Sequence, residues 1–194
     1  MRLPLFPLDT VLFPGCVLDL QIFEARYLDM VSQCLKAGHG FGVVHILDGS
    51  EVGAAPASFA RIGCEALIRD WQQLPNGLLG IRVEGGRRFE VESHEVMRDQ
   101  LAVAQVAWRG EADARPLAAR HADLLVLLEA LGQHPMVKTL GLGGAVGDQA
   151  SLANQLAYLL PFEPEQKIEL LGLDEPERQL EQIQNLLERL QDGA

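Results

Sequence analysis

Apolar and polar residues alternate through much of the first half of this sequence, and this period of two constrains the fold more than any other feature. The alternation runs through residues 18–22, 62–69 and 79–84, and it resumes at Phe89 and Val91. Successive side chains of a strand point to opposite faces of a sheet, so each segment predicts a strand with one buried and one solvated face.

Turn-forming residues separate these segments. Pro14-Gly15 suits a type II turn, Pro75-Asn76-Gly77 suits a tight connection, and Gly85-Gly86 suits a bulge or bend. Several short strands separated in this way predict a barrel or a strongly bent sheet.

Helical spacing occurs once within the β region. Residues 25–37 predict a helix that Gly38 ends, because apolar residues recur there at intervals of three and four. The predicted buried face consists of Tyr27, Met30, Val31, Cys34 and Leu35.

After about Trp108 the pattern becomes helical throughout. A polar linker over 110–116 precedes predicted helices over 117–131 and 151–160, and two more begin near Pro164 and Pro176, the last with a capping box of Asp174 and Glu177. The predicted fold class is therefore α+β. It has a β-rich unit over 1–110 with one inserted helix, followed by a helical subdomain over 111–194.

The charge balance narrows the classes of partner. The chain has 16 Lys and Arg against 27 Asp and Glu, a net charge of −11, so phosphate backbones and anionic lipid would repel it. We therefore expect no nucleic-acid partner.

No stretch is long and apolar enough to span a membrane, and no secretion signal is recognisable, so we expect a cytoplasmic protein without a membrane partner. Cys16, Cys34 and Cys64 are widely spaced and predict buried apolar side chains rather than disulfides or zinc ligands.

The sequence lacks the signatures of common catalytic and cofactor sites. It has no Gly-x-x-x-x-Gly-Lys-Ser/Thr loop and no His-Glu-x-x-His motif. The five histidines are scattered without metal-ligand spacing, and His121 fits its helix as a core residue. Glycines in 141–147 are misplaced for dinucleotide binding and predict a flexible connection, and Arg87-Arg88 predicts a solvated hairpin edge. We expect no catalytic residue, no metal and no cofactor.

Several motifs along the chain carry a resemblance to a known family. Residues 3–8 read Leu-Pro-Leu-Phe-Pro-Leu, Phe13-Pro14-Gly15 follows, and Phe23-Glu24-Ala25-Arg26-Tyr27 stands at the helix entry. The likeness continues through residues 41–44, 60–64, 85–91 and 156–190. Together these motifs resemble the N-terminal, substrate-binding domain of the Lon ATP-dependent proteases, and especially the small stand-alone proteins made of that domain.

The resemblance implies a β-rich pseudobarrel of the PUA-like type followed by a C-terminal helical bundle. It also implies a non-enzymatic protein that binds peptide segments of client or unfolded proteins, through exposed strand edges or an apolar groove. Two alternatives stay open. The C-terminal helices could act as a protein-assembly or adaptor module, because the last one has a narrow apolar stripe of Leu180, Ile183, Leu187 and Leu190. The barrel could instead bind a small molecule or RNA, by analogy with other PUA-like proteins. No feature of the sequence indicates the oligomeric state.

The candidate peptide-binding residues lie at the helix entry. They are Phe23, Glu24, Arg26 and Tyr27. An arginine and an aromatic residue beside a barrel opening can hold a peptide. The structural alternative is that Glu24 favours the helix dipole, Arg26 pairs with a carboxylate and Tyr27 packs in the core.

Overall fold

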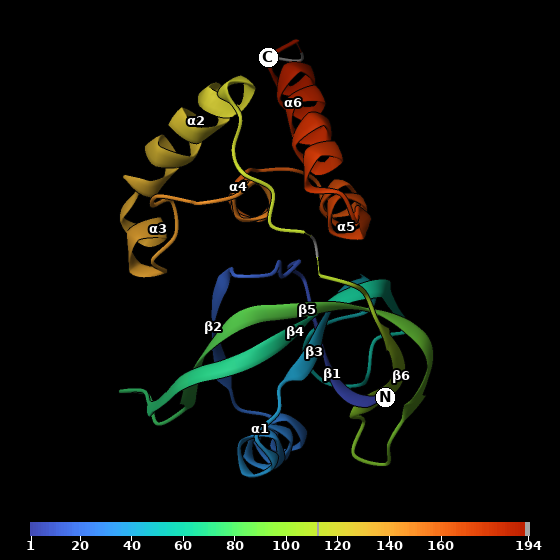
Figure 1. Ribbon diagram of the computed structural model, residues 1–194. Coiled ribbons are helices and arrows are strands. Elements are labelled where there is room, and N and C mark those ends of the chain that lie inside the picture. The colour runs from blue at the N-terminus through green and yellow to red at the C-terminus, as the bar shows by residue number, and fades with distance from the viewer. Residues whose placement is uncertain (112, 193–194) are drawn as a thin grey trace. The chain divides into compact units, whose positions relative to one another are not determined.

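The computed structural model describes residues 1–111 and 113–192, and the chain divides into two compact units (Figure 1). Unit 1, Met1–Arg109, contains β1 (Arg2–Leu8), β2 (Val17–Ile22), α1 (Ala25–Ala37), β3 (Phe41–Asp48), β4 (Ser58–Gln73), β5 (Leu79–Val96) and β6 (Ala102–Trp108). Unit 2, Gly110–Ala194, contains the 3-10 helix η1 (Ala119–His121) and helices α2 (Ala122–Gly132), α3 (Pro135–Thr139), α4 (Gln149–Leu159), α5 (Pro164–Gly172) and α6 (Pro176–Asp192). None of the described helices is long and apolar enough to cross a membrane.

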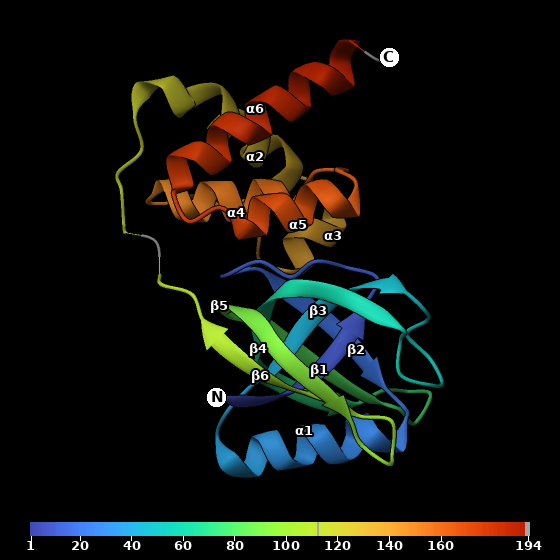
Figure 2. The ribbon, with the colours of Figure 1, turned by 90° about the vertical axis from the view of Figure 1, so that its right-hand side faces the viewer.

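The strands of unit 1 form one sheet whose order is β2-β5-β4-β3-β1-β6, and a further pairing between β5 and β6 closes it into a ring. β1 runs parallel to β3 and antiparallel to β6. The first half of β5 pairs with β2, and residues 89–96 of the same strand pair with β6. β2 is therefore an additional strand attached to β5 outside the closed ring. The two longest strands, β4 and β5, run side by side across the barrel (Figure 2).

The strands differ from the prediction in length. Separate short strands were expected, but β4 and β5 run for 16 and 18 residues, and Gly85-Gly86 lies inside β5. A Cβ on Gly85 would overlap the carbonyl of Phe13, so glycine permits this close approach of two main chains. The expected bulge is present: Cys64 pairs with Arg88 and Ala66 with Gly85, so Gly86 and Arg87 of β5 lie opposite one residue of β4. The glycine pair bends a continuous strand instead of ending it.

The predicted type II turn precedes β2. Gly15 has φ +73°, and the N–H of Cys16 donates to the carbonyl of Phe13 at 3.1 Å. The N–H of Gly15 also donates to the carbonyl of Gly85 at 2.8 Å, and the N–H of Gly85 donates to the carbonyl of Cys16 at 2.8 Å. These bonds form a glycine bulge that fixes the register of β2 on β5.

Alternating side chains fill the interior of the ring, as the period of two predicts. One buried cluster consists of Leu3, Leu5, Val44, Phe59, Phe89, Val91, Ala102, Ala104 and Val106. The Phe89 ring lies against two glycines: a Cβ on Gly42 or on Gly63 would lie 2.7 or 2.5 Å from the Cζ atom of Phe89. The absence of side chains at these two positions makes the space that the ring occupies.

Helix α1 confirms the predicted inserted helix at both ends. It spans Ala25–Ala37, and Gly38 closes it in the left-handed conformation with φ +69°. Four of the five predicted apolar residues are buried, namely Tyr27, Met30, Val31 and Cys34. The fifth, Leu35, is 45% exposed.

Helix α4 contacts both α2 and α6 within unit 2. Its Leu152 and Leu156 are fully buried. Of the predicted stripe of α6, Leu180 and Ile183 are buried, Leu187 is half-buried and Leu190 is exposed, whereas Leu186, outside the stripe, is buried. The buried face of α6 therefore turns away from the predicted stripe towards its C-terminal end.

The glycine-rich segment 141–147 connects α3 to α4 and packs closely against α2. Gly143 has φ +76°, and a Cβ on it would overlap the main chain of Gly132. Its N–H donates to the Oε1 atom of Gln155 at 2.9 Å, and the neighbouring Leu142 is buried. The flexible connection expected from the sequence is a close crossing of two main chains, which glycine at both positions allows.

The prediction that Arg87-Arg88 is solvated holds for Arg87, which is exposed, and is wrong for Arg88. Arg88 is buried, because it lies opposite the buried Cys64 in the β4–β5 pairing. Arg87 lies over the ring of Trp108, with its Cζ atom 4.0 Å from the ring centroid, and its Nε atom is 3.6 Å from a carboxylate oxygen of Glu65. The three cysteines are free and buried, as predicted.

We expect His121 to make unit 2 less stable in mild acid. Its ring is buried, and Nδ1 accepts a hydrogen bond from the N–H of Ala118 at 3.1 Å, which requires a neutral ring. Burial lowers the pKa of His121 from its ordinary value of 6.5. The unfolded chain therefore takes up this proton at a higher pH than the folded chain. The free energy of unfolding consequently falls as the pH drops through about 6.5 and levels off below the folded pKa.

Amide hydrogen exchange in α2 and α4 at neutral and mildly acidic pH measures this change. His121→Gln should flatten the dependence, and an unchanged dependence in that variant would contradict the assignment.

Candidate functional site

One edge of β2 has no strand neighbour in the described part of the chain, because β2 pairs with β5 alone. Hydrogen-bonded and non-hydrogen-bonded residue pairs alternate along an antiparallel ladder. The bond from the Gly85 N–H to the Cys16 carbonyl starts this ladder, so every second residue from Cys16 onward bonds to β5. The N–H and C=O groups of Asp19 and Gln21 therefore face away from the sheet.

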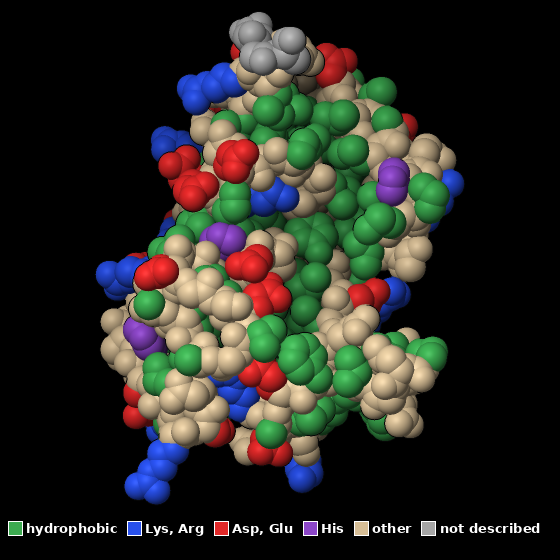
Figure 3. Space-filling model, turned by 180° about the vertical axis from the view of Figure 1, so that it is seen from behind, with side chains coloured by type: hydrophobic (Ala, Val, Ile, Leu, Met, Phe, Trp, Pro, Cys, Tyr) green, Lys and Arg blue, Asp and Glu red, His purple; other side chains and the backbone are tan. Residues whose placement is uncertain are grey.

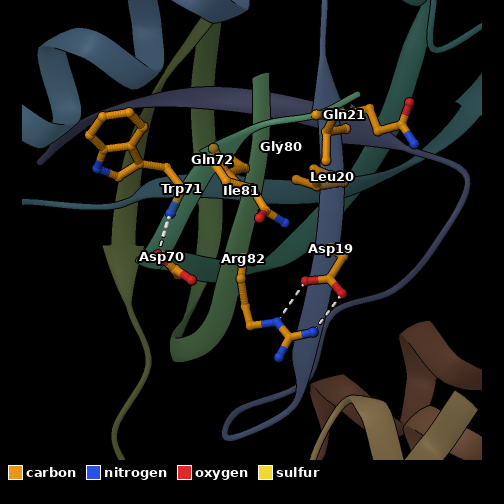
Figure 4. Close-up of a pocket in the computed structure, with 10 residues that line it drawn as sticks. Asp19, Leu20, Gln21, Asp70, Trp71, Gln72, Gly80, Ile81 and Arg82 are labelled. Carbon is orange, nitrogen blue, oxygen red and sulfur yellow. Dashed lines mark hydrogen bonds and ion pairs between the residues drawn. The ribbon is translucent and has the colours of Figure 1, made fainter. Parts of the chain in front are cut away.

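A hollow of about 340 Å³ lies on the β4–β5 hairpin side of β2, and we call it the hairpin hollow (Figure 4). Asp19 and Arg82 point towards each other there and make two hydrogen bonds of 2.8 Å. The hydrogen bond from Arg82 lowers the pKa of Asp19, so the pair is ionised at neutral pH. Trp71 lines the same hollow and is 62% exposed. The hairpin projects from the barrel and carries hydrophobic side chains on the face seen at the lower right of Figure 3.

A smaller hollow of about 140 Å³, the entry hollow, shares Asp19, Leu20 and Gln21 with the hairpin hollow. The two hollows therefore meet at β2. Three of the four residues predicted from the sequence line the entry hollow, namely Phe23, Glu24 and Tyr27. Phe23 and the neighbouring Val52 are 53% and 55% exposed.

Tyr27 belongs to the buried wall of the entry hollow. Its ring stacks on Phe6 with the centroids 4.0 Å apart, and burial raises the pKa of its hydroxyl to about 12. The hydroxyl therefore stays neutral at physiological pH. Phe23 is the exposed aromatic residue at this end of β2, and Tyr27 packs in the interior.

Arg26 is separated from the hollows by its own partners. Its side chain is buried, with Nη2 at 3.1 Å from the Glu24 carboxylate and Nη1 donating to the Gln100 carbonyl at 2.8 Å. The Glu24 carboxylate also accepts from the N–H of Gly53 at 3.2 Å, and the Gln100 side chain accepts from the N–H of Ala55 at 3.3 Å. Arg26 thus joins the helix entry to two turns of the barrel, as the structural interpretation of this residue expected.

A third hollow, of about 810 Å³, lies between α1 and the turn that joins β5 to β6. Its apolar lining includes Met30, Met97 and Leu101. Its strand residues Pro4 and Val103 are paired with each other across β1 and β6. This hollow offers apolar side chains but no free strand edge.

Three residues of the β2 region were missed by sequence reasoning: Gln21, Val52 and Trp71. Trp71 had a signal, because it stands alone in the polar run Arg69–Gln73 beside a turn. Aromatic residues are enriched in protein interfaces, so an aromatic side chain in a polar run is a candidate contact residue. Val52 lies in the connection between β3 and β4, and its place beside β2 depends on tertiary structure.

Comparison with known proteins identifies the family. A family model described as the ATP-dependent protease La (LON) substrate-binding domain matches residues 2–189. Curated relatives include Lon proteases of Phenylobacterium zucineum, 25% identical over 93% of this chain, and of Roseiflexus castenholzii, 29% identical over 96%. The chain spans only 24% of the length of each of these relatives.

Solved structures agree with this match. The crystal structure of a Lon N-terminal domain protein from Xanthomonas campestris is 36% identical, with a TM-score of 0.77 over 95% of this chain and 98% of that chain. The N-terminal domain of a Mycobacterium avium complex Lon protease shares the fold, with a TM-score of 0.61 at 17% identity over 94% of this chain and 96% of that chain. The chain therefore belongs to the family of the Lon protease substrate-binding domain.

Proposed function

We propose that this chain binds segments of other polypeptides along β2, and that it carries out no chemistry on them. The observation that carries the proposal is the pair of aromatic side chains beside β2. Phe23 and Trp71 are both more than half exposed, and each lines a hollow that reaches the unpaired edge. Exposed aromatic side chains next to hollows are typical of protein-binding surfaces.

The family supports a polypeptide as the ligand. Its description is a substrate-binding domain, and the curated relatives are named as proteases. We assign recognition of the polypeptide to this chain. The PUA-like type of the barrel, the bundle arrangement of unit 2 and direct peptide contact by Glu24 stay predictions that accompany the proposal. Arg26 and Tyr27 are buried, and in this proposal they support the site from within.

The adaptor alternative has less support in the structure. Leu180 and Ile183 of the apolar stripe of α6 are buried within unit 2, where α6 contacts α4. Its exposed remainder includes Leu190, close to the end of the helix. β2, with its unpaired backbone and two adjacent hollows, is the more complete binding surface.

We expect the chain to bind a permanently unfolded protein and Phe23→Ser/Trp71→Ser to bind it at least about tenfold more weakly, since buried aromatic contacts dominate protein interfaces. Fluorescence anisotropy of labelled, reduced and alkylated lactalbumin measures the affinity, with native lactalbumin as the folded comparison. Val126→Ser is the matched control, because Val126 is 64% exposed but lies in unit 2. Wild-type affinity in the double variant would refute the site, and no binding by the wild-type chain would refute the function.

A further inference from the structure

The unpaired edge of β2 points to a specific binding mode, which rests on the proposed function. We propose that the bound polypeptide adds to β2 as an extra strand, through main-chain hydrogen bonds to Asp19 and Gln21. These two residues present outward N–H and C=O groups, and the alternation of the ladder places both on one edge. The complement of such an edge is another extended main chain.

The surroundings of the edge leave room for alternate side chains of the added strand. Both hollows are lined by Asp19, Leu20 and Gln21, so side chains of the added strand come to lie beside them. The entry hollow presents apolar groups of Phe6, Leu8 and Phe23. The hairpin hollow presents Trp71 together with the ionised pair of Asp19 and Arg82.

The charged groups around the two hollows favour some extended segments as ligands over others. The residues lining the two hollows include four carboxylates, and two guanidinium groups face them. The carboxylates are Asp19, Glu24, Glu51 and Asp70, and the guanidinium groups are Arg26, behind Glu24, and Arg82. The remaining negative charge favours a ligand with lysine or arginine between its apolar residues and disfavours an acidic one. The ligand class is therefore an extended apolar segment with basic residues, presented by a chain without stable tertiary structure.

Gln21 provides a substitution that separates main-chain from side-chain recognition. Its N–H faces outward, so Gln21→Pro removes a donor from the free edge and leaves the bonds to β5 in place, as proline on an edge strand permits. Gln21→Ala removes the side chain and retains the donor. The probe is a short fluorescein-labelled peptide in which valine alternates with lysine, and its affinity is measured by anisotropy.

We expect Gln21→Pro to weaken binding about fivefold relative to Gln21→Ala, which is the effect of one lost hydrogen bond. A second measurement uses two peptides that are N-methylated at every second amide, one at the odd and one at the even positions. Only one of these two sets of amides faces β2, so one of the two peptides should lose binding to the wild-type chain. This second measurement keeps the proposal testable if Gln21→Pro fails to fold, which circular dichroism would show. A glutamate-for-lysine version of the peptide should bind more weakly than the original.

The outcomes separate this inference from the proposed function. If both Gln21 variants and all N-methylated peptides bind like their parents, strand addition is refuted while recognition of unfolded chains through side chains stands. If the wild-type chain binds neither the peptide nor unfolded lactalbumin, both are refuted. If sedimentation shows a wild-type dimer that Gln21→Pro dissociates and the peptide does not compete with it, a second copy occupies the edge and the proposal is wrong.

Discussion

Replacing Arg26 by alanine is expected to lower the free energy of unfolding of unit 1 by about 3 kcal/mol, because removing one partner of a buried ion pair leaves the other charge unpaired. The side chain of Arg26 is 4% exposed and that of Glu24 is 20% exposed. The substitution also removes the donor to the Gln100 carbonyl. Urea unfolding followed by tryptophan fluorescence measures the change in unit 1 alone, since both tryptophans, Trp71 and Trp108, lie there.

Arg82→Ala is the matched control for this prediction. Arg82 also makes a close ion pair, but its side chain and that of Asp19 are 39% and 50% exposed. Exposed pairs of this kind contribute at most about 1 kcal/mol. Equal losses of stability in the two variants would contradict a structural role for Arg26 that depends on burial.

Phe89→Ala is expected to lower the free energy of unfolding by about 3–5 kcal/mol, the range for deleting a buried aromatic ring. Phe89 is fully buried, and its ring meets Trp108 edge-on with the centroids 6.0 Å apart. The cavity would open where Gly42 and Gly63 leave the main chain without side chains to fill it. Phe23→Ala is the control, because Phe23 is an exposed phenylalanine of the same unit and its loss should change stability little.

A double-mutant cycle can test the contact between Phe89 and Gly63. Gly63→Ala alone should destabilise by about 1–3 kcal/mol through overpacking against the ring. In a Phe89→Leu background the same change should be less destabilising, which a double-mutant cycle detects. Strictly additive effects would show that the methyl group at Gly63 is resisted by the Val43 carbonyl, also 2.5 Å from the added Cβ, rather than by the ring.

The sequence predicted the local elements of the fold well and their pairing poorly. The period of two marked the buried face of β5, and the spacing of apolar residues gave α1 its bounds. In β4 the alternation was only half right, because Gly63 and Glu65, expected on the solvated face, are buried as well. Gly85-Gly86 was correctly predicted as a bulge or bend, but the expectation of separate short strands was wrong, because a bulge adds a residue to a strand without ending it. Arg88 was misread because burial opposite Cys64 depends on the partner strand, which leaves no local mark in the sequence.

The sequence predicted the candidate site residues at the entry to α1, but not those in the rest of the β2 region. Phe23, Glu24 and Tyr27 are near one another in sequence and line one hollow. Trp71 reaches the same strand only because β5 pairs with both β2 and β4. The unpaired edge of β2 could not be predicted, because the number of neighbours of a strand depends on the order of the whole sheet and not on the residues of that strand.

The pairing of β1 has a consequence for how this chain is made. Arg2 pairs with Gln105 in β6, and the Met1 ammonium group donates to the Val106 carbonyl at 3.0 Å. β1 thus has its second neighbour at the far end of unit 1, and joining segments so distant in sequence is slow. β1 can pair only with β3 until β6 has been synthesised, so the barrel closes late during translation.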